Sequence, residues 1–167
     1  GGWIWKPVAE RLRKAGHDVY TPTLDGCAER AHALRPGITT ETHADEIVEM
    51  MRFHDLSNVV IAGTSSGGMV MARVAETAPE RISRVVFADA LALFDGEKIT
   101  DIVKQPAKVT TAIARGPTRE DAHGRLFAGL EPQQQAEVEP GAREHFGALA
   151  AGRERRQRIR EQERATG

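Results

Sequence analysis

A serine framed by glycines is the clearest chemical signal in this sequence. The stretch Gly63-Thr64-Ser65-Ser66-Gly67 matches G-x-S-x-G, a pattern in which a serine hydroxyl stands on a sharp turn and acts as a nucleophile. A strand meets a helix at that turn, so the residues two before and two after Ser65 must be small, and Gly63 and Gly67 meet this need. The free N–H groups of the helix start point at whatever the serine attacks. The pattern predicts nucleophilic catalysis by Ser65.

The flanking residues predict the strand and the helix that such a turn requires. Residues 58–62 are a short apolar run, typical of a strand buried on both faces. Beyond the turn, five apolar residues recur at helical spacing: Val70, Met71, Val74, Ala75 and Ala78. A turn rich in glycine and serine can also cradle a phosphate, but neither G-x-x-x-x-G-K-[ST] nor G-x-G-x-x-G is present here. We therefore interpret the stretch as a nucleophile elbow.

Composition places the chain among ordinary globular proteins. Its 167 residues are enough for one domain with a core, and 40% are hydrophobic and 28% charged. A formal net charge of −1 gives no reason to expect a nucleic acid or a membrane as partner. Cys27 is the only cysteine, which excludes an intrachain disulfide and fits a reducing compartment, so we expect a cytoplasmic protein. No apolar run approaches the roughly 18 residues of a membrane helix.

Before the elbow, the pattern predicts helices and one further strand. Residues 5–15 fit a helix with an apolar face of Val8, Leu12 and Ala15, and Gly16 is a natural residue to follow its end. Residues 17–21 fit a short strand. Residues 23–38 fit a loop with a helical turn near 28–34.

The next helix is expected to begin at Thr42, with Asp45 in the position of a capping box. Its apolar stripe would be Ala44, Ile47, Val48 and Met51. After the elbow helix, residues 84–89 fit another strand. Helices and strands that alternate in this way predict an α/β fold with a parallel, doubly wound sheet, whose ligands lie at the carboxyl ends of the strands. Six residues are expected to be buried side by side in that sheet: Val59, Val60, Ile61, Val85, Val86 and Phe87.

The pattern weakens toward the C-terminus. Residues 99–103 fit the start of a helix, and residues 104–152 contain scattered helical windows interrupted by glycine and proline. Residues 153–167 form a tail of mixed charge, which fits a solvated helix or disorder. We expect residues 104–167 to be less ordered than residues 1–103.

Residues 1–103 resemble the α/β-hydrolase superfamily, and within it the branch of small bacterial carboxylesterases, plant methylesterases and hydroxynitrile lyases. Members of this branch carry a loop of the type H-G-x-W-H-G-G-W-x-W after an early strand, and residues 1–5 read G-G-W-I-W. Further matches follow in order: A-G-H-D-V-Y-T-P-T-L-D-G-C-A-E-R at 15–30, D-L-S-N-V-V at 55–60, P-E-R-I at 79–82 and D-A at 89–90. Residues 1–103 would then be a partial hydrolase core, residues 104–152 a cap-like or irregular helical segment, and the chain a piece of a longer protein.

The resemblance implies a role for each residue of the elbow. Ser65 would be the nucleophile, activated by a histidine that a carboxylate orients, and the N–H of Ser66 would be one oxyanion-hole donor. The second donor in this branch lies on the first H-G-x of the early loop, ahead of Gly1. Gly2 and Trp3 are therefore expected near the site rather than in the oxyanion hole. The elbow has Thr64 where many members of the superfamily have histidine.

The acid and the base of the triad have no clear place in the sequence. The superfamily order is Ser, Asp, His, each after its own strand, and neither of the later strands is recognisable. His123 and His145 are the histidines after Ser65, and each is better explained as a surface residue. Asp89 and Asp95 follow the strand after the elbow helix, a position that this branch does not use for its acid.

The remaining polar residues have simpler interpretations. The other four histidines precede the elbow: His17, His32, His43 and His54. His32 fits a packing role in a family loop, and Glu29 with Arg30 fits an ion pair or a loop brace. His43 and Asp45 lack a third metal ligand at a sensible spacing, so no metal and no cofactor is expected.

Two functions of different classes follow. The first is hydrolysis of a small carboxylic ester through an acyl-enzyme on Ser65, with cyanohydrin cleavage as a sister chemistry that the sequence does not separate. The second is a non-catalytic fragment that keeps the sheet and the elbow but lacks the acid and the base. We expect the chain alone to hydrolyse an activated ester barely above background.

Overall fold

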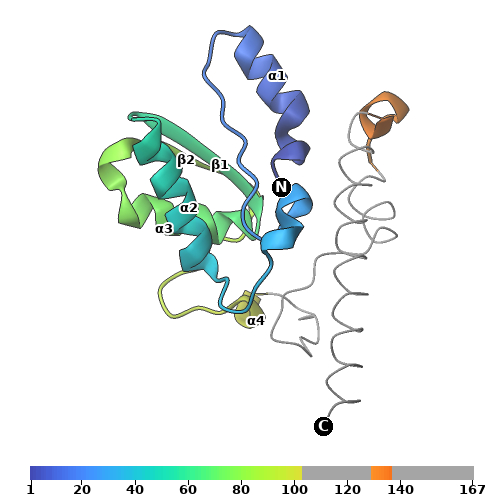
Figure 1. Cartoon of the computed structure of the whole chain (residues 1–167). Helices are drawn as coiled ribbons and strands as arrows, with labels where there is room; N and C mark the ends of the chain where they lie inside the picture. The colour runs from blue at the N-terminus through green and yellow to red at the C-terminus, as the bar shows by residue number, and fades with distance from the viewer. Residues whose placement is uncertain (103–128, 137–167) are drawn as a thin grey trace. The chain divides into compact units, whose positions relative to one another are not determined.

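The computed structural model describes residues 1–102 and 129–136 of the chain (Figure 1). The described part falls into two compact units, with residues 1–35 in one and residues 36–102 in the other. Most of the two expected C-terminal segments, 104–152 and 153–167, lies outside the described residues, although residues 132–136 are helical. Among the helices that are described, none is both long and apolar enough to cross a membrane.

The first unit opens with a short 3₁₀ helix, η1 (Gly2–Trp5), and continues into α1 (Lys6–Lys14). Pro7 lies in the first turn of α1, where its missing N–H costs no hydrogen bond. The helix ends in a Schellman motif: Gly16 has a φ of 89° and its N–H donates to the carbonyl of Arg13, while the next N–H donates to Leu12. Gly16 thus confirms the predicted end of the helix.

The apolar residues that share a face of α1 are not its most buried residues. Val8 and Leu12 remain 48% and 41% exposed, whereas Ala9 is 1% exposed and forms the packed side of the helix. Helical spacing predicts which side chains share a face, but burial depends on what packs there. In α1 the closely packed residue is the small Ala9.

Residues 17–21 do not form the predicted strand. A strand is defined by its hydrogen-bonded ladder, and the ladder seen in the described residues belongs to the second unit. The segment is instead tied to α1, because the guanidinium of Arg13 donates to the carbonyl of Val19 over 2.5 Å. The loop that follows contains the 3₁₀ helix η2 (Ala28–Ala33), which confirms the predicted helical turn.

The second unit begins with α2 (Thr40–Phe53), whose start differs from the prediction. The N-cap is Thr39, and Thr42 is the third residue of the helix rather than its cap. The two threonines form a reciprocal capping box, in which each hydroxyl accepts from the other's backbone N–H at 3.3 and 3.4 Å. Asp45 therefore has no part in the cap. Several threonines close together in sequence can each fill this role, so spacing alone did not identify the correct one.

A parallel pair of strands follows. Strand β1 (Val59–Ser65) pairs with β2 (Ile82–Ala90), and α3 (Gly67–Thr77) with the 3₁₀ turn η3 (Pro79–Arg81) makes the crossover between them. The short helix α4 (Ile99–Ile102) closes the described part of this unit. Parallel strands joined through a helix confirm the predicted α/β class.

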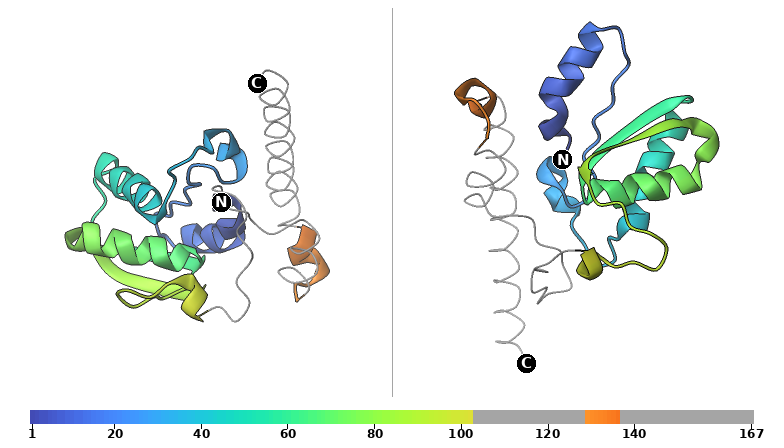
Figure 2. Two further views of the ribbon diagram at one scale, coloured as in Figure 1. Left: turned by 90° about the horizontal axis from the view of Figure 1, so that it is seen from below. Right: turned by 180° about the vertical axis from the view of Figure 1, so that it is seen from behind.

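Helices α2 and α3 pack together on one face of the two-stranded sheet (Figures 1 and 2). The core between them consists of residues from both helices: Ala44, Val48, Met51, Val74 and Ala78. Met51 and Val74 are 1% and 0% exposed. The helical stripes predicted from the sequence therefore contain the core of this unit, as expected.

The predicted burial of the strand residues is wrong on the opposite face. The register pairs Ile61 with Val85, and these side chains are half-buried on the helix-covered side. Val60 and Val86 alternate to the other face and remain 57% and 44% exposed. Phe87, two residues beyond Val85, returns to the helix side and is nevertheless 46% exposed, so its predicted burial is wrong as well. An apolar run in a parallel strand predicts cover on both faces. Within the described part of this unit, the helices cover one.

Candidate active site

Ser65 stands where the sequence predicted it, at the junction of strand and helix. It is the last residue of β1, Ser66 is the N-cap, and Gly67 is the first residue of α3 (Figure 1). A single residue therefore separates strand from helix. The strand–turn–helix geometry of a nucleophile elbow is confirmed.

The backbone of Ser65 is held in a conformation that most residues avoid. Its φ is 51°, in the left-handed region where a Cβ crowds the backbone. The neighbouring strand anchors it, because the N–H of Leu91 donates to the carbonyl of Ser65 over 2.9 Å. Asp89, near the end of β2, is also left-handed, with a φ of 50°, and its carbonyl accepts from the hydroxyl of Thr64 at 3.4 Å. The two strand ends hold each other in shape.

The start of α3 supplies hydrogen-bond donors beside the serine. Ser66 has helical backbone angles, φ −60° and ψ −16°, and its own side chain makes no capping hydrogen bond to the helix. The first N–H groups of a helix have no carbonyl acceptor within it, and the aligned peptide dipoles make this end positive. Both Ser65 and Ser66 are exposed, so an incoming group can reach these donors.

The glycines around the elbow differ from the prediction in one respect. A Cβ on Gly63 would lie 2.8 Å from the sulfur of Met71 and 3.1 Å from the carbonyl oxygen of Gly67, so the close packing predicted there is confirmed. At Gly67 a Cβ would meet nothing within 4 Å among the described residues, so the predicted need for glycine is wrong there. The tight position is Gly68, where a Cβ would overlap the carbonyl of Leu91. The Gly-Gly doublet in the sequence was the available signal for it.

Gly2 and Trp3, expected near the site, lie in η1 of the first unit. Gly2 is buried and donates its N–H to the hydroxyl of Thr23 at 2.7 Å. A side chain on Gly2 would overlap the carbonyl of Thr21, so this packing requires glycine. The proximity of Gly2 and Trp3 to Ser65 stays a prediction.

The histidines that precede the elbow are spread over several elements. The Nδ1–H of His32 donates to the carbonyl of Glu29 over 3.2 Å, in the loop role predicted for it, and His17 follows the end of α1. His43 lies in α2, and His54 is its C-cap and packs edge-on against Phe53. His123 and His145 lie outside the described residues.

The charged residues of the first unit form a loop brace with a different pairing from the predicted one. Arg30 forms its ion pair with Asp25, which also binds Arg35, and the guanidinium of Arg30 donates to the carbonyl of Thr23 at 2.8 Å. Glu29 instead accepts a hydrogen bond from Thr23, which lowers the pKa of its carboxyl below the usual value. Within the described ranges, no three His, Cys, Asp or Glu residues are grouped to hold a metal ion.

Comparison with known proteins gives a consistent result. The sequence profile of the family described as alpha/beta hydrolase fold matches residues 1–142. A carbendazim-hydrolyzing esterase from Nocardioides sp. (strain SG-4G) is 34% identical over 118 residues, which cover 70% of this chain and 49% of the esterase. An alpha-hydroxynitrile lyase from Arabidopsis thaliana is 26% identical over 91 residues, covering 54% of this chain and 35% of the lyase.

A solved structure supports the fold. It is an extracellular alpha/beta-hydrolase from a Paenibacillus species, described as sharing structural and functional homology with Tobacco Salicylic Acid Binding Protein 2. The similarity has a TM-score of 0.55 at 35% identity and covers 60% of this chain and 40% of the other. The chain thus spans half or less of the length of these relatives.

Proposed function

Because this chain belongs to the alpha/beta hydrolase fold family, we propose that it takes part in the hydrolysis of a small carboxylic ester, with Ser65 as the nucleophile. The observation that supports this most is the left-handed Ser65 between the end of β1 and the uncapped start of α3. Strain of this kind at an exposed serine is typical of a functional site. The similarity to an esterase over 70% of the chain supports the substrate class.

The proposed reaction uses Ser65 and the backbone beside it. The Oγ of Ser65 attacks the carbonyl carbon of the ester, and its proton passes to a general base, which in this family is a histidine. The carbonyl oxygen becomes an oxyanion, and the N–H of Ser66 donates to it. Collapse of this intermediate expels the alcohol and leaves an acyl group on Ser65. Water then attacks the acyl carbon and releases the acid and the free serine.

The test is covalent labelling together with turnover. A fluorophosphonate should modify Ser65, identified by peptide mass spectrometry, and Ser65→Ala should lose both the label and any hydrolysis of 4-nitrophenyl acetate. Ser66→Ala is the matched control, because it removes a neighbouring hydroxyl but keeps the backbone N–H. Label on another residue, or turnover well above background that persists in Ser65→Ala, would contradict the proposal. A reactive Ser65 with turnover near background would indicate the non-catalytic fragment.

Cyanohydrin cleavage is the second candidate, supported by the similarity to a hydroxynitrile lyase over 54% of the chain. The two reactions separate by product. Release of benzaldehyde from mandelonitrile above the spontaneous decomposition at the same pH reports lyase activity, whereas release of 4-nitrophenol from the acetate reports hydrolysis. Ser65-dependent benzaldehyde release without ester turnover would favour the lyase.

A further inference from the structure

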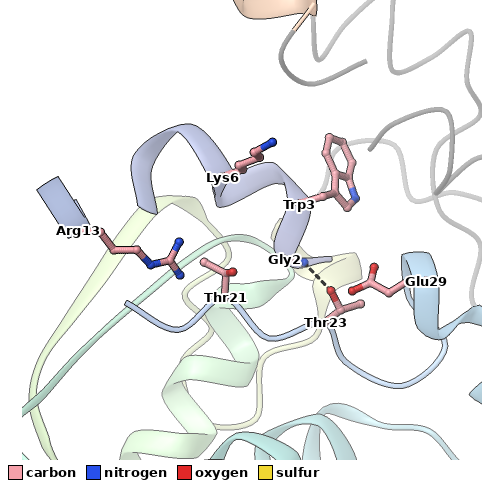
Figure 3. A pocket seen from close by; sticks show the side chains of 7 residues that line it. All are labelled: Gly2, Trp3, Lys6, Arg13, Thr21, Thr23 and Glu29. Carbon is pink, nitrogen blue, oxygen red and sulfur yellow. Dashed lines mark hydrogen bonds between the residues drawn. The ribbon is translucent and has the colours of Figure 1, made fainter. Parts of the chain in front are cut away.

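A cavity of about 400 Å³ opens in the first unit and has no part in the proposed reaction (Figure 3). Its walls come from η1, from α1, from the loop that follows α1 and from η2. Two basic side chains and one carboxylate line it, so its surface is polar and charged. A small molecule is the class of ligand that fits this volume.

Two positive charges on α1 line the cavity without carboxylate partners. Lys6 and Arg13 are two turns apart, which places them on the same side of the helix. The ammonium group of Lys6 has neither a hydrogen bond nor an ion pair among the residues that the structure describes. Arg13 donates to the carbonyl of Val19, and its guanidinium lies on the side of the cavity where Thr21 is (Figure 3). Neither cation is neutralised by the described part of the protein.

Glu29 adds one negative charge to the lining of the cavity. The hydroxyl of Thr23, whose residue is 7% exposed, accepts from the N–H of Gly2 (Figure 3). The same hydroxyl interacts with Glu29 and lowers the pKa of its carboxyl. This interaction favours the ionised form of Glu29. A ligand with two or three negative charges would meet repulsion from Glu29, so a monoanion is favoured over inorganic phosphate.

The geometry points to a binding site for a small organic monocarboxylate, held by Lys6 and Arg13, with its apolar part against the indole of Trp3. A guanidinium presents parallel N–H groups that match the two oxygens of a carboxylate. Trp3 also lines the cavity, where its half-buried indole offers an aromatic surface (Figure 3). The cavity is thus charged at one end and apolar beside it.

Benzoate is the probe that tests this assignment. Titration of the full ¹⁵N-labelled chain, with benzoate exchanged for chloride at constant ionic strength, should shift the indole N–H resonance of Trp3 more than that of Trp5. We expect a dissociation constant in the millimolar range or below. Arg13→Met and Lys6→Met should each weaken binding about three- to tenfold. Arg11→Met and Lys14→Met remove equal charges from α1 outside the cavity and should leave binding unchanged.

Three further results can overturn the assignment. Equal weakening by all four α1 variants would mean that only net charge attracts benzoate. Glu29→Gln should strengthen binding of benzoate, and a loss of affinity there would contradict the assigned repulsion between Glu29 and the ligand. Ser65→Ala should bind benzoate as the wild type does, and its failure to bind would assign benzoate to the elbow. Absence of saturable binding by the folded wild-type chain would refute the site, whatever the outcome of the Ser65 labelling.

Discussion

The backbone N–H of Leu91 donates to the carbonyl of Ser65, 2.9 Å away, and so joins the residue after β2 to the candidate nucleophile at the end of β1. The same Leu91 contributes the carbonyl that leaves no room for a side chain on Gly68. Leu91 therefore holds the elbow from two sides. The shape of the turn depends on the neighbouring strand as well as on the G-x-S-x-G residues themselves.

We predict that Gly68 is less tolerant of substitution than Gly67, although Gly67 is the glycine of the motif. Gly68→Ala would push a methyl group into the carbonyl of Leu91 and should lower the free energy of unfolding by about 1–3 kcal/mol. Gly67→Ala enters open space at the start of a helix and should cost less than about 0.5 kcal/mol. Urea unfolding followed by circular dichroism measures both, and equal losses would contradict the packing at Leu91.

Replacing Ser65 by glycine should relieve the backbone strain, so that the variant is stable although it is inactive. Glycine adopts a φ of 51° without a Cβ clash, whereas alanine does not. Ser65→Gly should therefore be more stable than Ser65→Ala by about 1 kcal/mol, and both should lack the proposed hydrolysis. Thermal unfolding of the two variants gives the comparison. If Ser65→Ala proved the more stable, the left-handed conformation would not persist in solution.

Two neighbours in α2 should respond very differently to truncation. Met51 is 1% exposed in the core between α2 and α3, so Met51→Ala should cost about 2–5 kcal/mol. Arg52 forms an exposed ion pair with Glu49, and Arg52→Ala should cost less than about 1 kcal/mol. Chemical unfolding under identical conditions tests the difference. A large effect at Arg52 would mean that the charged face of α2 is packed in solution.

The hydrogen bond from Thr23 should make stability depend on pH through Glu29. Because the pKa of Glu29 is lowered in the folded chain, the ionised carboxylate stabilises the fold above its unfolded pKa, and this contribution is lost as the pH falls through the folded pKa. Thr23→Val should raise the pKa of Glu29 and reduce the loss of stability in acid. An NMR titration of the Glu29 carboxyl carbon, with urea unfolding at several pH values, tests this. Thr21→Val is the control and should leave both unchanged.

The elbow could be predicted because its signals are local. A glycine-framed serine, an apolar run before it and helical spacing after it lie within one short stretch, and backbone sterics alone connect them to the observed turn. The helical stripes of α2 and α3 were predictable for the same reason, since one face of an amphipathic helix must be covered.

The errors concern features that depend on distant partners. Residues 17–21 have strand composition, but a ladder requires a second strand beside them. The exposure of Val60 depends on what covers the sheet, and the tight position at Gly68 depends on Leu91, far along the chain. The charged cavity is a similar case. Only the folded unit brings α1 together with Thr23 and Glu29, so no short motif marked it.

The hydrogen bond between Leu91 and Ser65 can form only after the chain has been synthesised as far as Leu91. During translation Ser65 emerges from the ribosome before α3, and β2 and Leu91 follow later. A parallel pair cannot close as a simple hairpin, because its crossover must be synthesised first. The strained turn at Ser65 therefore has no anchor until Leu91 has left the exit tunnel, and the nascent chain carries an unformed elbow for that interval.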